Sequence, residues 1–118
     1  MLEIRGAILE IKPVRQVSER FSVQLIYIDT STYNNYTGER YDNIALIQNI
    51  NNKVNIQGLA VGHLITCSCY LNGRMYNKQD GSKGFTQNIT LSSWEYVQNR
   101  LGEVITIPKE QLIDISGL

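Results

Sequence analysis

The chain has 118 residues, enough for one domain with a single modest hydrophobic core. Its hydrophobic fraction of 42% and charged fraction of 19% exclude an intrinsically disordered chain, and its apolar runs are too short for a membrane-spanning helix. Eleven basic and eleven acidic residues cancel, so the overall charge gives no support to nucleic-acid binding. Charges at Glu3, Arg5 and Glu10 exclude a secretory signal peptide, and we therefore expect a cytoplasmic protein without a membrane partner.

Hydrophobic residues recur with a period of two along most of the chain, which predicts strands and not helices. The predicted strands are residues 2–11, 21–29, 41–48, 64–73 and 85–97. In the second strand the odd-numbered residues from Phe21 to Tyr27 share one face, which predicts that Tyr27 lies in the core.

The next two predicted strands also separate into two faces. In 41–48, Tyr41 shares its face with Asn43, Ala45 and Ile47, opposite Ile44 and Leu46, which predicts an outward Tyr41. In 64–73, the residues predicted to point inward are Ile65, Cys67, Cys69 and Leu71. The two cysteines are expected to be reduced and buried, because adjacent positions on one strand face suit neither a disulfide nor, without a second ligand pair, a zinc ion.

The connections between the strands indicate the fold. Residues 49–62 are predicted to form a short helix or turn, and residues 72–84, with Asn-Gly and Asp-Gly steps, a long hairpin between strands four and five. We therefore predict an all-β, five-stranded OB-fold barrel over residues 1–99. Residues 100–118 are predicted to be a short C-terminal extension, with a short strand and a helical turn after Pro108.

Several short motifs, taken in order, resemble the bacterial and phage single-stranded DNA-binding protein family. The run VGHLITCSCYLNGRMYNKQDGSKGFTQNITL resembles the fourth and fifth strands of that family, and the upstream match is Tyr33, then Thr37-Gly38-Glu39, then Tyr41. The resemblance covers about residues 2–97. It implies an OB fold in which Tyr33, Tyr41 and Tyr76 stack on bases.

The residue chemistry of these positions agrees with that implication, because sequence-independent binding needs flat rings for bases and cations for phosphates. Tyr36 lies in the same polar loop as Tyr33, and Arg40 precedes Tyr41. The candidate DNA-binding residues are Tyr33, Tyr36, Arg40, Tyr41, Arg74, Tyr76, Lys78 and Lys83. The alternative for each tyrosine is a ring that lies on its own domain with the hydroxyl in water.

No pattern in the chain predicts catalysis. The single histidine, His63, has no nucleophile or carboxylate in a recognisable arrangement, and neither a GxxxxGK[ST] nor a GxGxxG motif occurs. We therefore expect a protein that is not an enzyme and that carries no metal site and no cofactor.

The function predicted from the sequence is binding and protection of single-stranded DNA, or RNA, in DNA replication, recombination or repair. The family resemblance also implies a homo-oligomer, either a dimer or a tetramer. Two features differ from the family: Ile47 stands where a stacking Phe can occur, and the C-terminus lacks the acidic tip that recruits partner enzymes. These differences leave open a second interpretation, in which the OB fold is a protein–protein assembly module that does not bind DNA.

Overall fold

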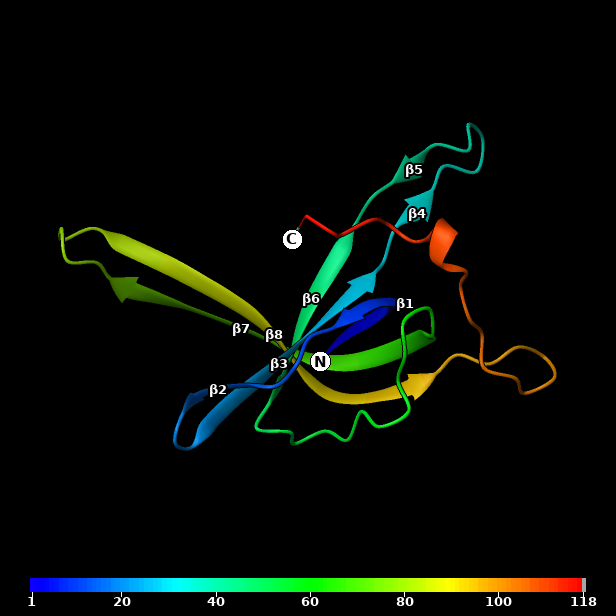
Figure 1. The fold of residues 1–118 in the computed structure, drawn as a ribbon. Helices are drawn as coiled ribbons and strands as arrows, with labels where there is room; N and C mark the ends of the chain where they lie inside the picture. The colour runs from blue at the N-terminus through cyan, green and yellow to red at the C-terminus, as the bar shows by residue number, and fades with distance from the viewer. Residues whose placement is uncertain (118) are drawn as a thin grey trace.

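The computed structural model describes residues 1–117; Leu118, the last residue of the predicted extension, lies outside them. Residues 1–117 form eight β-strands and one short 3₁₀ helix, η1 (Figure 1). The strands are β1 (Leu2–Ile11), β2 (Arg15–Ser18), β3 (Phe21–Asp29), β4 (Thr32–Tyr33), β5 (Arg40–Tyr41), β6 (Ile44–Ile50), β7 (Leu64–Asn77) and β8 (Lys83–Tyr96). The helix η1 is Lys109–Gln111. None of the helices in residues 1–117 is long and apolar enough to cross a bilayer.

Five of the strands close into a ring, which confirms the predicted OB-fold barrel. The ring runs β1-β7-β8-β6-β3, and β3 pairs back onto β1. All the pairings are antiparallel except the short parallel pairing of β6 with β8. At Gly6, β1 passes so close to β3 that an added Cβ would lie 2.3 Å from the carbonyl oxygen of Asp29. Only glycine permits this approach, which closes the ring.

The barrel interior is filled mainly by isoleucines. The buried cluster consists of Ile8, Ile26, Ile28, Ile47, Ile65, Cys67, Cys69 and Leu91. On β3 the inward residues are therefore even-numbered, so the prediction that Tyr27 lies in the core with the odd-numbered residues is wrong. Both faces of β3 carry apolar residues, and the narrow interior takes the β-branched Ile26 and Ile28.

The face assignment of β6 also needs correction. Ile47 is fully buried and Ala45 packs against the core, whereas Leu46 is exposed. The face predicted to be outward is thus the inward one within β6. Tyr41 belongs to a separate strand, β5, and two residues, Asp42 and Asn43, break the alternation between it and β6.

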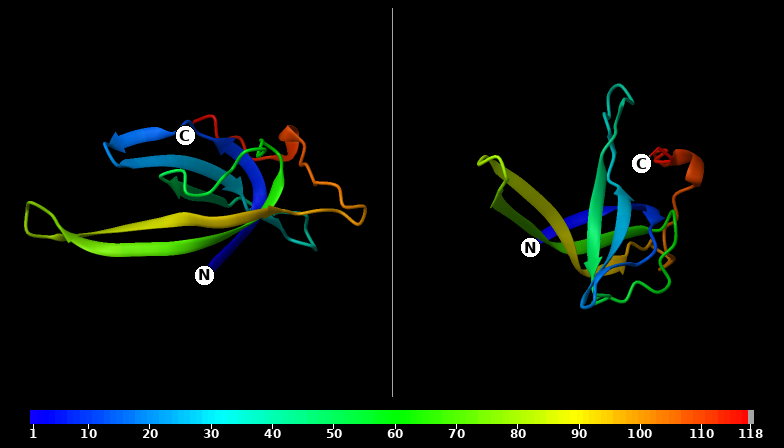
Figure 2. Two further views of the ribbon diagram at one scale, coloured as in Figure 1. Left: turned by 90° about the horizontal axis from the view of Figure 1, so that it is seen from below. Right: turned by 60° about the vertical axis from the view of Figure 1, so that its left-hand side comes forward.

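The hairpin of β7 and β8 extends beyond the barrel as a two-stranded arm, on the left of Figure 1. Ile65, Cys67 and Cys69 are buried, as predicted, but Leu71 is 56% exposed because the strand has left the barrel there. Two further views show the arm reaching away from the other strands (Figure 2). A second projection, made by β4 and β5, leaves the barrel in a different direction.

Two further segments, residues 51–63 and 98–113, lie against the barrel. Residues 51–63 form turns without a helix, the second of the two predicted forms. Trp94 Nε1 and Tyr96 Oη anchor this segment by donating to the carbonyl oxygens of Asn55 and Gly58, each at 2.8 Å. Residues 98–113 return along the barrel through bridges that pair Gln98 with Val104 and His63 with Thr106, and then form η1 after Pro108.

Candidate nucleic-acid interface

The β7–β8 arm has two chemically different faces. Antiparallel partners share a face and neighbours along a strand alternate, so the register assigns each side chain. The polar face of the arm carries Tyr70, Asn72, Arg74 and Tyr76 from β7 and Gly84, Thr86, Asn88 and Thr90 from β8. The apolar face of the arm carries Leu71, Gly73 and Met75 from β7 and Phe85, Gln87 and Ile89 from β8.

On the polar face the aromatic rings and the cation lie in one row. Tyr70 is 51% exposed and Tyr76 is 45% exposed, with Arg74 between them on the same strand. At a rise of about 3.4 Å per residue, the row from Tyr70 to Tyr76 spans about 20 Å. No carboxylate in residues 1–117 forms an ion pair with Arg74. The row therefore offers two stacking surfaces and one unpaired positive charge.

The ring of Tyr76 is supported by a glycine directly opposite on β8. An added Cβ at Gly84 would lie 2.3 Å from Cζ of Tyr76, so the ring crosses the space that a side chain there would fill. The glycine thus lets the ring lie against the sheet with one face outward. That geometry is the one a stacking platform needs.

The other two predicted cations of the arm take different positions. Lys78 lies in the turn, where its backbone pairs with that of Ser82, and Lys83 opposes Asn77 on the side of the apolar face. Asp80, the one acid of this turn, accepts hydrogen bonds from the Ser82 side chain and backbone, which hold its pKa below the ordinary value. Only Arg74 therefore shares a face with Tyr76.

The β4–β5 hairpin separates the tyrosines that the sequence grouped together. Tyr33 opposes Arg40, and Thr32 opposes Tyr41, so the rings of Tyr33 and Tyr41 are on opposite faces. Tyr36 is at the hairpin tip and is 99% exposed. The turn is held by Asn34 Oδ1, which accepts from the N–H groups of Tyr36 and Thr37 at 2.8 and 3.2 Å.

Arg40 is held within the protein by two hydrogen bonds and two ion pairs, although its buried Nε has no hydrogen-bond partner within residues 1–117. Its Nη2 donates to Asp29 Oδ2 at 2.8 Å, its Nη1 donates to the carbonyl oxygen of Gln111 at 2.9 Å, and its Nε lies 3.0 Å from Asp42 Oδ1. The guanidinium also lies 5.9 Å from the ring centre of Tyr33. Arg40 thus ties the β4–β5 hairpin to the barrel and to the C-terminal segment.

Asp29 stays ionised to low pH at the centre of this network. Burial alone would raise the pKa of Asp29, but hydrogen bonds from Ser31 and from the Ile113 N–H, with the charge of Arg40, hold the pKa below its ordinary value. The side chain of Asp29 is only 7% exposed. The carboxylate is therefore a structural anchor for three separate segments.

The structure brings some of the predicted site residues together and separates others. Tyr76 and Arg74 share one face of one arm, whereas Tyr33, Tyr36 and Tyr41 belong to a different projection. Sequence reasoning did not include Tyr70 as a site residue, although its position six residues before Tyr76 on one strand is a usable signal. Ile47 is buried and has no access to a base.

The two cysteines lie in the barrel interior. Both are free and buried, and burial, with Cys69 nearby, raises the pKa of Cys67 to about 12. A thiol in this state is neutral and unreactive at ordinary pH. Within residues 1–117, no group of three or more His, Cys, Asp or Glu side chains is arranged to hold a metal ion.

Comparisons with known proteins establish the fold. No protein-family model matches the sequence, and no curated protein matches it. Among solved structures, the chain is similar to the protein priB from Ralstonia solanacearum, with a TM-score of 0.53 and 10% identity, over 80% of this chain and 93% of that chain. That neighbour is an OB-fold protein, and the ring of five strands described above agrees with it. The chain is therefore an OB-fold protein.

Proposed function

We propose that this protein binds single-stranded DNA without sequence preference and protects it during replication, recombination or repair. The polar face of the β7–β8 arm is the observation that carries the proposal. It presents Tyr70, Arg74 and Tyr76 in one exposed row, with no ion pair to Arg74 within residues 1–117. In this proposal the domain acts as a binding module and not as an enzyme.

Stacking supplies the sequence tolerance of this mechanism, because every base has a π face. Each base stacked on an aromatic side chain contributes about 1–3 kcal/mol. Tyr76 is held flat by Gly84, so little of that gain is lost in ordering the ring. Arg74, with Lys78 and Lys83 near the tip of the arm, supplies local positive charge on a chain whose net charge is zero. RNA offers the same π faces and phosphates, so it is a second ligand of the same chemistry.

The neighbour in structure gives modest support to the proposed pathway. The fold of the protein priB matches most of this chain, and an OB fold of this kind agrees with a single-stranded DNA-binding role. We propose that this chain forms a homo-oligomer, either a dimer or a tetramer, as the family resemblance implies. Several arms on one strand would raise the overall affinity by effective concentration, without any new contact.

The apolar face of the arm favours a second candidate function, a protein–protein assembly module. Leu71, Met75 and Phe85 are each more than half exposed and share this face, where Met75 directly opposes Phe85. Exposed apolar side chains in a row are typical of a protein contact. In this alternative the arm joins protein subunits, and its tyrosines lie at the edge of the contact.

Fluorescence anisotropy with labelled oligo-dT, at several salt concentrations, separates the two candidates. For DNA binding we expect the logarithm of the affinity to fall with the logarithm of the salt concentration, with a slope of about −0.7 per phosphate contacted. Tyr70→Ala and Tyr76→Ala are each expected to cost about 1–3 kcal/mol. Absence of binding to a strand of about 30–70 nucleotides at low salt would overturn the proposal, since an OB fold covers about 4–16 nucleotides.

A further inference from the structure

A cavity lies away from the β7–β8 arm, on the outer side of β1. Its volume is about 350 Å³. The floor is formed by Ala7 and Leu64, which oppose each other across β1 and β7, and Ile107 of the C-terminal segment adds to it. Ala7 is only 4% exposed although it faces outward from the barrel. The cavity is therefore built by the segments that fold over this face.

One wall of the cavity is a single aromatic ring. Tyr33 lines the cavity and is 58% exposed, with Arg40 on one side of its ring. Because Asp29 and Asp42 form ion pairs with Arg40 and the carbonyl oxygen of Gln111 accepts a hydrogen bond from it, the charge of this cation is compensated within the protein and the side chain supports the ring.

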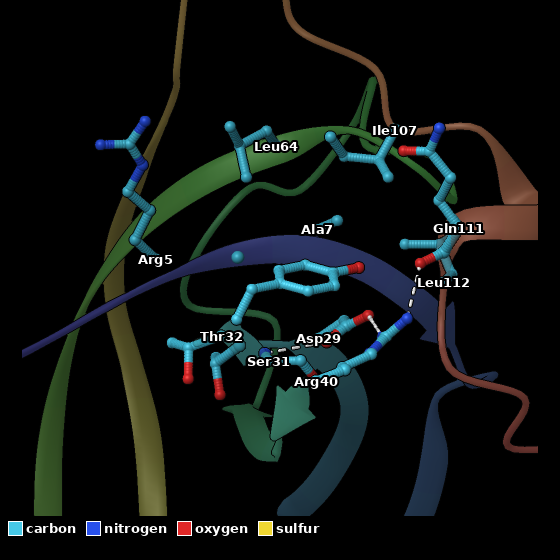
Figure 3. Close-up of a pocket in the computed structure, with 13 residues that line it drawn as sticks. Arg5, Ala7, Asp29, Ser31, Thr32, Arg40, Leu64, Ile107, Gln111 and Leu112 are labelled. Atoms are coloured by element: carbon cyan, nitrogen blue, oxygen red, sulfur yellow. Dashed lines mark hydrogen bonds and ion pairs between the residues drawn. The ribbon is translucent and has the colours of Figure 1, made fainter. Parts of the chain in front are cut away.

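The free charge of the cavity is Arg5. Figure 3 shows Arg5 at the upper left of the pocket and Arg40 below its centre, with Ala7 between them. Arg5 is exposed on β1, opposite Thr66 of β7, and no carboxylate in residues 1–117 forms an ion pair with it. The cavity thus combines an apolar floor, one ring and one unpaired cation.

We propose that this cavity takes one nucleotide of the bound single strand. The resemblance already implies a base stacked on Tyr33. The cavity adds an apolar floor on the other side of that base and Arg5 as the ligand of its phosphate. A cavity of about 350 Å³ is at the small end of the range for ligand sites, about 300–1,000 Å³, and suits one nucleotide. The inference rests on the function proposed above and adds a second contact region to it.

The C-terminal segment becomes part of the binding site in this account. Ile107, Gln111 and Leu112 line the cavity, and backbone hydrogen bonds between Gly62 and Ile107 and between Leu64 and Ile105 hold the segment in place. A strand that enters the cavity must therefore touch residues 107–112. No such contact arises if DNA lies on the β7–β8 arm alone.

Photocrosslinking of the full chain provides the first test. The probe is oligo-dT of about 30 nucleotides with 4-thiothymidine at single positions, irradiated in the complex and mapped by mass spectrometry after proteolysis. We expect adducts on Tyr33 and on the peptide that contains residues 107–112, as well as on the arm. Adducts confined to the β7–β8 arm would overturn the cavity assignment and leave the proposed function standing.

A matched pair of arginine variants provides the second test. Arg5→Gln should make the slope of log affinity against log salt less steep by about 0.7. If the variant and the wild type bind equally at 1 M salt, this difference makes the variant about eightfold weaker than the wild type at 50 mM salt. Arg100→Gln, an exposed arginine in the 98–103 turn that does not line the cavity, should bind like wild type. Equal behaviour of the two variants would contradict a phosphate contact at Arg5. A wild-type protein that does not bind the probe at all would overturn both proposals together.

Discussion

Arg40 shows how a single side chain can join three parts of this molecule. Its guanidinium contacts Asp29 on β3, Asp42 after β5 and the carbonyl oxygen of Gln111 in η1. The sequence indicated Arg40 as a phosphate ligand because it precedes Tyr41, and that assignment stays a prediction. The geometry gives Arg40 a positioning role toward Tyr33, which lies above it.

Replacing the anchor of this network should destabilise the fold. Asp29→Asn removes the charge opposite a half-buried Arg40, and we expect a loss of about 1–3 kcal/mol in the free energy of unfolding, measured by urea denaturation. The control is Asp42→Asn, because Asp42 also contacts Arg40 but is 69% exposed, and a loss below about 1 kcal/mol is expected. Equal losses in the two variants would contradict the role assigned to Asp29.

The wild type and Asp29→Asn should also differ in how their stability depends on acid pH. The folded-state pKa of Asp29 lies below the ordinary value of 3.8, so its contribution is complete above pH 3.8 and is lost as the pH falls further. The free energy of unfolding should therefore fall more steeply below pH 3.8 in the wild type than in Asp29→Asn. Parallel pH curves for the two proteins would show that Asp29 is not the titrating group.

Replacing Gly84 should weaken DNA binding and leave the stability of the fold almost unchanged. In Gly84→Ala the added methyl group meets the far end of the Tyr76 side chain, which must swing away from the sheet. We expect weaker binding to oligo-dT with an unchanged thermal unfolding midpoint. Gln87→Ala, on the other face of the same strand, should bind like wild type. Wild-type affinity in Gly84→Ala would show that the ring position of Tyr76 is not important.

At the scale of elements, the β7–β8 arm is an exposed two-stranded hairpin that presents two different faces outside the barrel. An isolated two-stranded hairpin is only marginally stable in water, and all side chains from Tyr70 to Lys83 are exposed. Its two faces differ in chemistry while they share one backbone. Such an element suits binding along one face and association along the other.

Hydrogen exchange should show this difference in stability. Backbone amides of residues 74–86 should exchange faster than those of residues 64–69, where β7 is part of the barrel. Bound oligo-dT should slow exchange in the arm, because the ligand holds the hairpin in its folded form. If DNA slows exchange only elsewhere, the arm is not the interface.

The sequence supports prediction at this scale only where the two faces of a strand differ. On β7, Ile65, Cys67 and Cys69 alternate with polar residues, and their inward direction was predicted correctly. On β3 both faces are apolar, so alternation alone could not decide between Tyr27 and Ile28. The Arg40 network lay outside the reach of sequence reasoning, because residues 29, 40 and 111 meet only in the folded chain.

At the scale of the whole molecule, a chain with no net charge presents an unpaired cation at each of the two proposed contact regions. Arg74 lies on the arm, and Arg5 lies at the cavity on the outer side of β1. The order of strands and loops, and therefore the OB fold, could be predicted from periodicity and turn residues. The cavity could not, because its walls come from β1, β7, the 30–33 segment and the C-terminal segment.

The most direct test of the account compares two ring deletions on opposite faces of one arm. Tyr76→Ala and Phe85→Ala remove rings of similar exposure, 45% and 57%, from the polar and apolar faces. In one oligo-dT titration at fixed low salt, we expect Tyr76→Ala to bind about five- to 150-fold more weakly than wild type and Phe85→Ala to bind like wild type. Weaker binding by Phe85→Ala alone, or equal binding by both variants, would contradict the assignment of DNA to the polar face.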